Sequence, residues 1–213
     1  MSGIHLALLG MSFGGGIPDI GAAYQGGFFA GQISTAGNGI ADYNLVIAPK
    51  SSGENSSKQW KTSNTSTAGT SSAIDGPANT AAMNNASHPA AQFCAAVSSG
   101  GFSDWYMPAQ NELDVCYFNL KPTTANNTTS SGINVNAVPS RASNYTTGTP
   151  AQTSATDFQT GNTEAFAGFF YWSSTEISAS LASDQDFRNG LQNTGSTDKI
   201  TAVYVRAVRR VAV

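Results

Sequence analysis

The stretch Phe169-Phe170-Tyr171-Trp172-Ser173-Ser174-Thr175-Glu176 and the later stretch Val203-Tyr204-Val205-Arg206-Ala207-Val208-Arg209-Arg210-Val211 decide the fold of this chain. In the second stretch, small apolar side chains alternate with tyrosine and arginine, which is the period of a strand with one buried face. The aromatic run of the first stretch also favours a strand. Between them, Asp186-Phe187-Arg188 is a further strand candidate, and Asn189-Gly190 is a hairpin signal. The C-terminal part is therefore predicted to be rich in strands.

Two more strands are predicted near the start of the chain. Residues 24–33 mix aromatic residues with glycines, and glycines inside a strand suggest a bulge or a close approach of backbone. Residues 43–48 form the next apolar run, which Pro49 ends. The polar region 51–75 contains one large apolar residue, Trp60, which we expect to fix this region onto the core.

Two helices are predicted in the middle of the chain, after a shorter helical candidate at 79–86. The first begins near Pro89 and ends at Gly100-Gly101, and the second follows Pro108 and ends at Lys121-Pro122. Between them, residues 104–107 are predicted to form a short strand that Pro108 ends. Their apolar residues recur at helical spacing; they are Ala90, Phe93, Cys94 and Val97 in the first helix, and Leu113, Cys116, Tyr117 and Leu120 in the second. Strands, helices and strands in this order indicate an α+β fold.

The two cysteines, Cys94 and Cys116, each lie on the apolar face of one predicted helix. Two cysteines are too few for a disulfide scaffold or a zinc site. Buried free thiols are the favoured interpretation, and a bridge between two packed helices is the alternative.

The composition excludes several classes of function. The formal net charge is −3, and the only basic cluster is Arg206, Arg209 and Arg210, so we expect no binding to nucleic acid. No stretch is apolar enough to span a bilayer. Residues 1–20 are rich in glycine and have no positive charge before the apolar run 4–9, so we interpret them as an attachment segment and not as an export signal.

Nothing in the sequence predicts catalysis. The histidines are His5, in the attachment segment, and His88, which directly precedes Pro89 and is expected to be a surface or capping residue. No nucleophile elbow, Walker loop or dinucleotide motif is present. Glu112 and Asp114 are two residues apart on a helix and do not face each other. We therefore expect neither an enzyme nor a cofactor.

Asp184 and Asp186 lie on one face of a predicted strand. Their oxygens are of the type that calcium prefers. A partly exposed binding strand without metal is the alternative, and it is the interpretation favoured here, so no metal is expected.

Four motifs in this order carry a resemblance to a known family: Tyr24–Gly31, Asp104–Pro108 with Asn111–Leu113, Tyr171–Glu176, and Tyr204–Arg210. The chain resembles proteins with the Lcl C-terminal type domain, also called DUF1566, in the versions that occur in bacteriophage tail and tail-fibre proteins. The resemblance covers about residues 21–210. It implies a C-type-lectin-like domain over residues 21–213, with two helices packed on short antiparallel sheets and long ordered loops. It also implies binding of host surface molecules and no established catalysis.

The chain departs from related families in two respects. The Glu-Pro-Asn, Gln-Pro-Asp and Trp-Asn-Asp motifs of calcium-dependent lectins are absent, so the resemblance does not carry over calcium-dependent sugar recognition. The two cysteines lie on the early helices, so the activity of the formylglycine-generating enzymes is not carried over either.

The segment 177–202 is the predicted binding surface, because apolar, charged and amide side chains alternate there without a clear period. Its candidate ligand-binding residues are Ile177, Leu181, Ser183, Asp184, Asp186, Arg188, Leu191 and Asn193. The blocks around it are predicted to be structural, through Trp105, Glu112, Trp172, Glu176, Arg206 and Arg209. Arg206 or Arg209 is expected to pair with Glu112 or Glu176, and residues 173–176 are expected to hydrogen-bond neighbouring loops.

These expectations give two hypotheses for function. In the first, the protein is a receptor-binding or adhesion component of a phage tail, made in the host cytoplasm and incorporated into the virion, which recognises a host surface glycan or protein. Residues 1–20 then bind other tail proteins, and the chain forms a homo-oligomer, for which a trimer is expected. In the second, the protein is a structural virion subunit for decoration or fibre assembly, with no receptor role.

Overall fold

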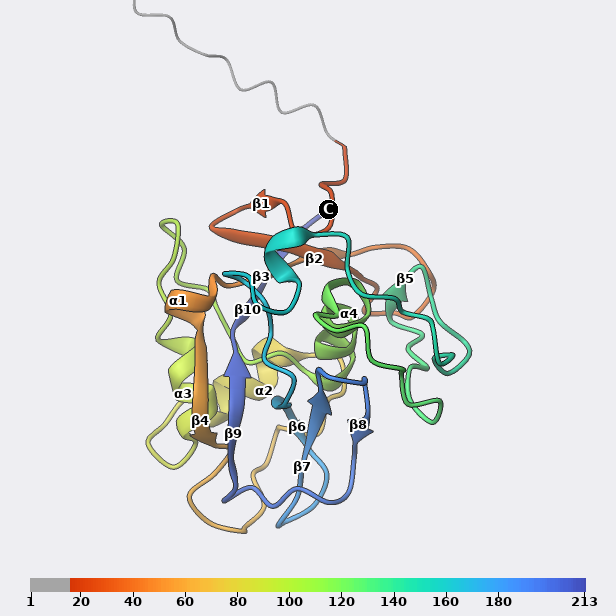
Figure 1. The fold of residues 1–213 in the computed structure, drawn as a ribbon. Coiled ribbons are helices and arrows are strands. Elements are labelled where there is room, and N and C mark those ends of the chain that lie inside the picture. Colours follow the sequence, from red (N-terminus) through yellow and green to blue (C-terminus); the bar gives the residue numbers. More distant parts are fainter. Residues whose placement is uncertain (1–15) are drawn as a thin grey trace, which may run out of the picture.

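The computed structural model describes residues 16–213, and its strands form two sheets (Figure 1). The first sheet has the order β1-β2-β3-β10, with β5 also paired to β2. The second has the order β4-β9-β6-β7-β8. The bounds are β1 Ala23–Tyr24, β2 Gly27–Ile33, β3 Tyr43–Ile47, β4 Glu54–Gln59, β5 Ala137–Val138, β6 Phe170–Glu176, β7 Ala182–Asp186, β8 Gln192–Asn193, β9 Ala202–Arg206 and β10 Val208–Ala212. The predicted α+β class is confirmed.

One pair of strands departs from the antiparallel arrangement that was expected. β6 and β9 run parallel, with Tyr171 opposite Tyr204. The other pairs of named strands are antiparallel. Expecting antiparallel sheets throughout was therefore wrong at this position.

The helices are α1 Lys50–Gly53, α2 Gly76–Met83, α3 Pro89–Ala95 and α4 Gln110–Leu120, with a 3₁₀ turn, η1, at Thr156–Phe158. The two predicted helices correspond to α3 and α4, and the shorter candidate corresponds to α2. The region 51–75 holds α1 and β4, which the sequence did not predict. The strand expected at 104–107 is wrong, because only the single bridge between Tyr106 and Val208 forms there.

The strand expected over 203–211 is divided between the two sheets. β9 ends at Arg206, opposite Glu54, and β10 begins at Val208, opposite Ile47. Between them, the Ala207 amide donates to the Gly53 carbonyl, and the Ala207 carbonyl accepts from the Ala48 amide. The chain therefore crosses from one sheet to the other twice, at 48–53 and at 207, and the two crossings are hydrogen-bonded to each other.

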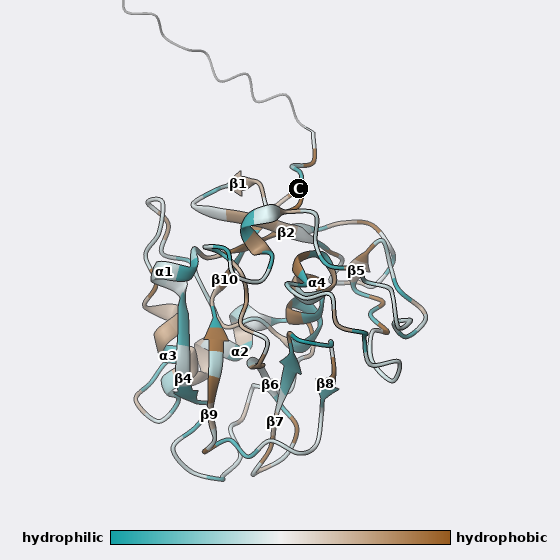
Figure 2. Cartoon of the chain, in the orientation of Figure 1, coloured by the Kyte–Doolittle hydropathy of each residue, from teal (hydrophilic) through white to brown (hydrophobic). Residues whose placement is uncertain are grey.

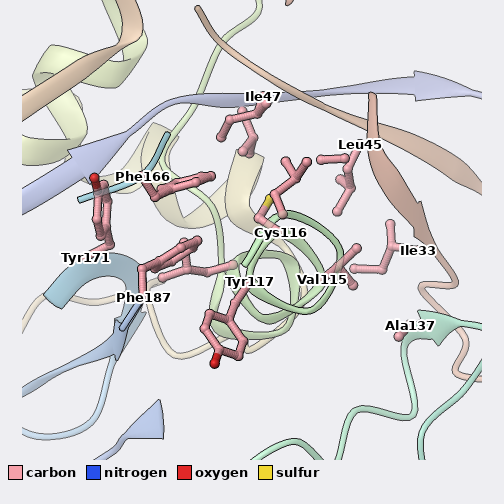
Figure 3. Packing of buried hydrophobic residues seen from close by; sticks show 14 of the residues in the cluster. Ile33, Leu45, Ile47, Val115, Cys116, Tyr117, Ala137, Phe166, Tyr171 and Phe187 are labelled. Carbon is pink, nitrogen blue, oxygen red and sulfur yellow. The ribbon is translucent and has the colours of Figure 1, made fainter. Parts of the chain in front are cut away.

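The buried apolar residues form two clusters. The first surrounds α4, where Val115, Cys116 and Tyr117 face β2, β3 and the aromatic group Phe166, Tyr171 and Phe187 (Figure 3). The second cluster contains all three tryptophans, Trp60, Trp105 and Trp172, together with Met83 and Cys94. Both cysteines are buried and free, as predicted. Burial raises the pKa of the Cys94 thiol.

The long polar stretch between α4 and β6 is ordered and packs on the domain, as expected. The Thr153 amide donates to the Lys121 carbonyl, and the Thr128 amide donates to the Asn189 carbonyl. Within residues 16–213, no helix combines the length and the apolar character that crossing a membrane requires.

The two ends of the described chain lie at one end of the domain, and loops of the second sheet lie at the other. Residues 16–20 and the end of β10 lie at the end formed by the first sheet, whereas the loops that follow β4, β6 and β8 lie at the opposite end (Figure 1). Ile20 packs against the first cluster, so the last part of the predicted attachment segment lies against the domain. Residues 1–15 lie outside the described residues.

Candidate binding surface

Three loops meet at the end of the second sheet that is remote from residues 16–20 (Figure 1). They are residues 60–75, 177–181 and 194–201, which we call the distal loops. The Lys61 amide donates to the Lys199 carbonyl over 3.2 Å, the Glu176 amide to the Thr70 carbonyl over 2.7 Å, and the Lys199 amide to the Ser180 carbonyl over 2.9 Å. Backbone bonds therefore join all three loops into one surface.

A buried ion pair fixes the distal loops from beneath. The Lys199 side chain is fully buried, and its Nζ lies 3.2 Å from Glu176 Oε2 and 4.7 Å from the centre of the Trp60 ring. The same Glu176 oxygen accepts from the Thr67 amide over 2.7 Å. Trp60 is buried in the core, as expected, and the cationic partner of Glu176 is a lysine and not an arginine.

His88 belongs to the same buried network. It is 4% exposed, so the expectation that it lies at the surface is wrong, although it occupies the N-cap position of α3. Its Nε2 lies 2.9 Å from Thr67 Oγ1, and its Nδ1 lies 3.0 Å from Asn85 Oδ1. Burial lowers the pKa of His88, and the ammonium groups of Lys61 and Lys199 lower it further.

The distal loops expose apolar and small polar side chains to solvent. Ile177 is 39% exposed and Ile200 is 44% exposed. Leu181, which lies in the same loop as Ile177, is half-buried. Ser178, Ala179 and most of residues 62–69 are also exposed. This mixture suits contact with a ligand, because an apolar centre surrounded by hydrogen-bonding groups is the usual composition of a binding patch.

Three of the predicted ligand-binding residues are buried in β7. Ser183, Asp184 and Asp186 are 1%, 1% and 2% exposed, so the partly exposed strand expected here is wrong. The whole strand is hydrophilic in sequence and yet enclosed (Figure 2). Strands β6 and β8 flank β7 on its two sides, which is why a polar strand can lie inside the domain.

Asp184 has an unusual environment within β7. Its Oδ1 has no hydrogen-bond partner, and its Oδ2 has a long contact of 3.5 Å with Asn193 Nδ2. Burial raises the pKa of Asp184 to about 7, against the opposing effect of hydrogen bonds from Thr197 and Asn193. Asp186 instead accepts from the Arg188 amide over 2.7 Å and lies 3.2 Å from the Arg188 guanidinium.

The remaining predicted residues lie on the hairpin from β7 to β8. Arg188 is at its turn, where the side chain is 63% exposed and the carbonyl accepts from Thr123 Oγ1 over 2.6 Å. Leu191 and Asn193 are half-buried on the returning arm. Because β7 separates this turn from Leu181 by about 17 Å of strand, the predicted residues do not form one patch.

The predicted structural residues are buried, apart from Glu176, which is half-buried, and their ion pairs differ from those expected. Arg206 pairs with Glu164 at 2.5 Å and with Glu54 at 3.7 Å, and Arg209 pairs with Asp104 at 2.7 Å. Glu112 pairs at 2.8 Å with Arg210. The prediction that Arg206 or Arg209 pairs with Glu112 or Glu176 is therefore wrong. Trp105 and Trp172 lie in the second cluster, as predicted.

The sequence interpretation missed the contribution of residues 61–70 and Lys199 to this surface. These residues are polar and have no periodic pattern, so they resemble an ordinary solvated loop. The one available signal was Trp60, which marked the region as attached to the core. Within residues 16–213, no group of three or more histidine, cysteine, aspartate or glutamate side chains is placed to hold a metal ion.

Neither a scan against protein-family models nor a search of curated proteins gives a match to this chain.

Proposed function

We propose that this protein is a receptor-binding or adhesion component of a bacteriophage tail, and that the distal loops contact the host surface molecule. The observation that supports this proposal is the arrangement of the two ends. Residues 16–20 leave the domain at one end, and the loops that expose Ile177 and Ile200 lie at the other (Figure 1). An attached protein with this arrangement presents its distal loops outward.

The proposal changes the binding residues that the sequence suggested. Ile177 and Leu181 stay in the contact surface, and Ile200 and the exposed part of 62–69 join it. Ser183 and Asp184 support the surface from inside, and Asn193 donates to Thr197 Oγ1 of the distal loops over 2.7 Å. Asp186, Arg188 and Leu191 lie at the separate hairpin turn. The ligand is a host surface glycan or protein, residues 1–20 bind other tail proteins, and the protein acts in the virion as a homo-oligomer, with a trimer as the expected state.

The test is binding of the purified, fluorescently labelled protein to intact cells from a panel of bacterial species. The double variant Ile177→Ser/Ile200→Ser should lose cell binding while keeping its melting temperature, because both side chains are substantially exposed. The matched control is Val213→Ser, which changes an aliphatic side chain that is 71% exposed directly after β10 and belongs to neither proposed surface. Equal cell binding by the folded double variant and the wild type would refute the proposed surface.

A second candidate function is that of a structural virion subunit, and a different surface favours it. Ile40, Ile133 and Val135 are 69%, 55% and 49% exposed, and their loops are joined where Asn136 Nδ2 donates to the Ser34 carbonyl over 2.8 Å. Exposed apolar groups on adjoining loops are typical of subunit contacts. If Ile133→Ser/Val135→Ser abolishes assembly while the double variant in the distal loops has no phenotype in the virion, this function replaces the first.

A further inference from the structure

Phe169 stands out among the exposed side chains of the described residues. It is 61% exposed, and it is the one aromatic residue among the large apolar side chains that are exposed in residues 16–213. It directly precedes β6 and lies outside both the distal loops and the segment 177–202. Neither the proposed receptor contact nor the packing of the core accounts for its exposure.

Both the backbone and the ring of Phe169 are held in place. The Phe169 backbone amide donates to the Ala167 carbonyl over 2.8 Å, and the Phe169 carbonyl accepts from the Phe187 amide over 3.0 Å. The ring stacks on Tyr204 with an interplanar angle of 4° and a distance of 5.7 Å between centres. An exposed aromatic ring that is already ordered loses little further freedom when a ligand covers it.

A buried tyrosine supports this stack. Tyr204 packs at 5.1 Å on Tyr171, which is fully buried beside Phe166 and Phe187 in the first cluster (Figure 3). The Tyr171 hydroxyl donates to Glu54 Oε2 over 2.9 Å and accepts from the Ala167 amide over 2.9 Å. Tyr204 covers one face of the Phe169 ring. Because the Phe169 side chain is mostly exposed, the other face of its ring is open to solvent.

Small, uncharged residues surround the pair. The irregularity between Asn55 and Lys58 of β4 places Ser56 and Ser57 across from Tyr204, and both serines are exposed. Ala202, which shares a strand face with Tyr204, is exposed as well, and so is Gly168 beside Phe169. On the side of β4 the surroundings therefore offer hydroxyl groups and free space without a formal charge, whereas Arg188 lies next to Gly168 on the side of the hairpin.

We propose that Phe169 and Tyr204 form a stacking platform for one ring of a neutral saccharide. The C–H face of a sugar ring packs on the flat face of an aromatic ring, and serine hydroxyls can exchange hydrogen bonds with sugar hydroxyls. The small exposed area of the Phe169–Tyr204 pair also favours a sugar over a protein as the ligand. A stable protein interface buries about 800 Å² on each partner around an apolar core, whereas this patch offers one open aromatic face. This platform is a second site, independent of the distal loops.

The test uses the full chain and an immobilised set of glucose, galactose and mannose oligomers, followed by titration calorimetry on those that bind. Phe169→Ala should weaken binding at least about tenfold, because the stacking face is lost. Phe169→Trp should keep it, because a larger aromatic face remains. The double variant Ile177→Ser/Ile200→Ser should bind these sugars like the wild type, which separates this platform from the proposed receptor surface.

Three results would overturn the proposal. The first is the absence of binding to any of the neutral oligomers, and the second is equal binding by Phe169→Ala and the wild type. The third is a change of oligomeric state, measured by light scattering, in Phe169→Ala alone, which would assign the platform to a subunit contact. Melting temperatures of the variants establish that each is folded, and Phe169→Trp keeps the test valid if the alanine variant is unstable.

Discussion

At the scale of single residues, Arg206 is the most highly connected charge in the domain. Its guanidinium donates to the Ala48 carbonyl over 2.9 Å, to the Glu164 carbonyl over 2.7 Å and to Glu164 Oε2 over 2.5 Å, and it lies 4.9 Å from the Phe166 ring centre. The residue is 1% exposed. It therefore joins the crossing between the sheets to the segment that precedes β6.

We expect Arg206→Ala to lower the free energy of unfolding by about 3–5 kcal/mol, because it removes the cationic partner of Glu54 and Glu164 and leaves the Ala48 and Glu164 carbonyl groups without their donor. Urea denaturation measures this change. Arg188→Ala is the matched control, since its side chain is 63% exposed and Asp186 keeps the hydrogen bond from the backbone amide of residue 188, and it should lower stability by much less than Arg206→Ala. Equal effects of the two substitutions would contradict the structural role of Arg206.

Asp184 is expected to make stability depend on pH in the direction opposite to most carboxyl groups. Burial raises its pKa to about 7, whereas in the unfolded chain an aspartate titrates near about 3.9. Its contribution to stability is thus fully present below about pH 4 and is lost as the pH rises through about 7, since the folded state then holds a buried charge.

Asp184→Asn should consequently be more stable than the wild type at pH 8, by roughly 2–4 kcal/mol. This difference should shrink as the pH falls towards 4. Thermal unfolding of both proteins across this range measures it. Asp157→Asn, at an exposed carboxylate, should show no such pH-dependent gain. A difference between Asp184→Asn and wild type that is constant with pH would contradict the raised pKa.

At the scale of elements, the loop between β4 and α2 depends on the protonation state of His88. The Nδ1 atom faces Asn85 Oδ1, which also accepts from the Ser87 amide, so Nδ1 carries the proton. The Nε2 atom then accepts from the Thr67 hydroxyl, whose oxygen lies 2.9 Å from Lys61 Nζ. A second proton on the ring would remove the acceptor for Thr67 and add a charge next to Lys61 and Lys199.

We therefore expect acid to weaken this loop through His88. Because the folded-state pKa is lowered, the unfolded chain binds the proton first, and stability falls as the pH drops below about 6.5 towards the folded-state pKa. His88→Gln should lose less in melting temperature than the wild type between pH 7.5 and pH 5. The control is His5→Gln, at the other histidine of the chain, which should keep the acid sensitivity of the wild type.

Sequence patterns were sufficient to predict an element where its apolar residues all contact one core. The helical spacing of Leu113, Cys116, Tyr117 and Leu120 predicted α4 because those residues contact one core. β4 was missed because its sequence, Glu54-Asn55-Ser56-Ser57-Lys58-Gln59, has little strand propensity and forms by pairing with β9. The alternation in 203–211 predicted strand correctly, but it contained no sign that Ala207 divides it between two sheets.

The candidate site was less predictable than the fold, because it depends on contacts between residues far apart in the chain. Lys199 and Glu176 are separated by the whole of β7 and β8, and the carbonyl group and the tryptophan that contact the Lys199 ammonium come from Thr65 and Trp60. Likewise, Ser183 and Asp184 are polar residues whose burial follows from the strands on both sides of β7. A single sequence gives the residue types at such positions, but it does not show which other segments bury them.

At the scale of the whole molecule, the connections between the two sheets lead us to expect that the two core clusters unfold together. Strands β3 and β4, and strands β9 and β10, each connect one sheet to the other within a few residues, and the two connections share backbone hydrogen bonds. The tryptophans all lie in the second cluster, so their fluorescence reports on that cluster alone. A substitution in the first cluster therefore tests whether destabilisation passes between them.

Leu120→Ala provides this test, because Leu120 is fully buried in the first cluster at the end of α4. The cavity should cost about 2–5 kcal/mol, and the urea midpoint from tryptophan emission should fall by as much as the midpoint from far-ultraviolet circular dichroism. A tryptophan transition that stays at the wild-type midpoint would mean that the clusters unfold separately. The distal loops would then rest on an independent unit, since Trp60 and Trp172 lie in the second cluster. If the clusters unfold together, any change in the first core also changes the fraction of molecules that present an intact binding surface.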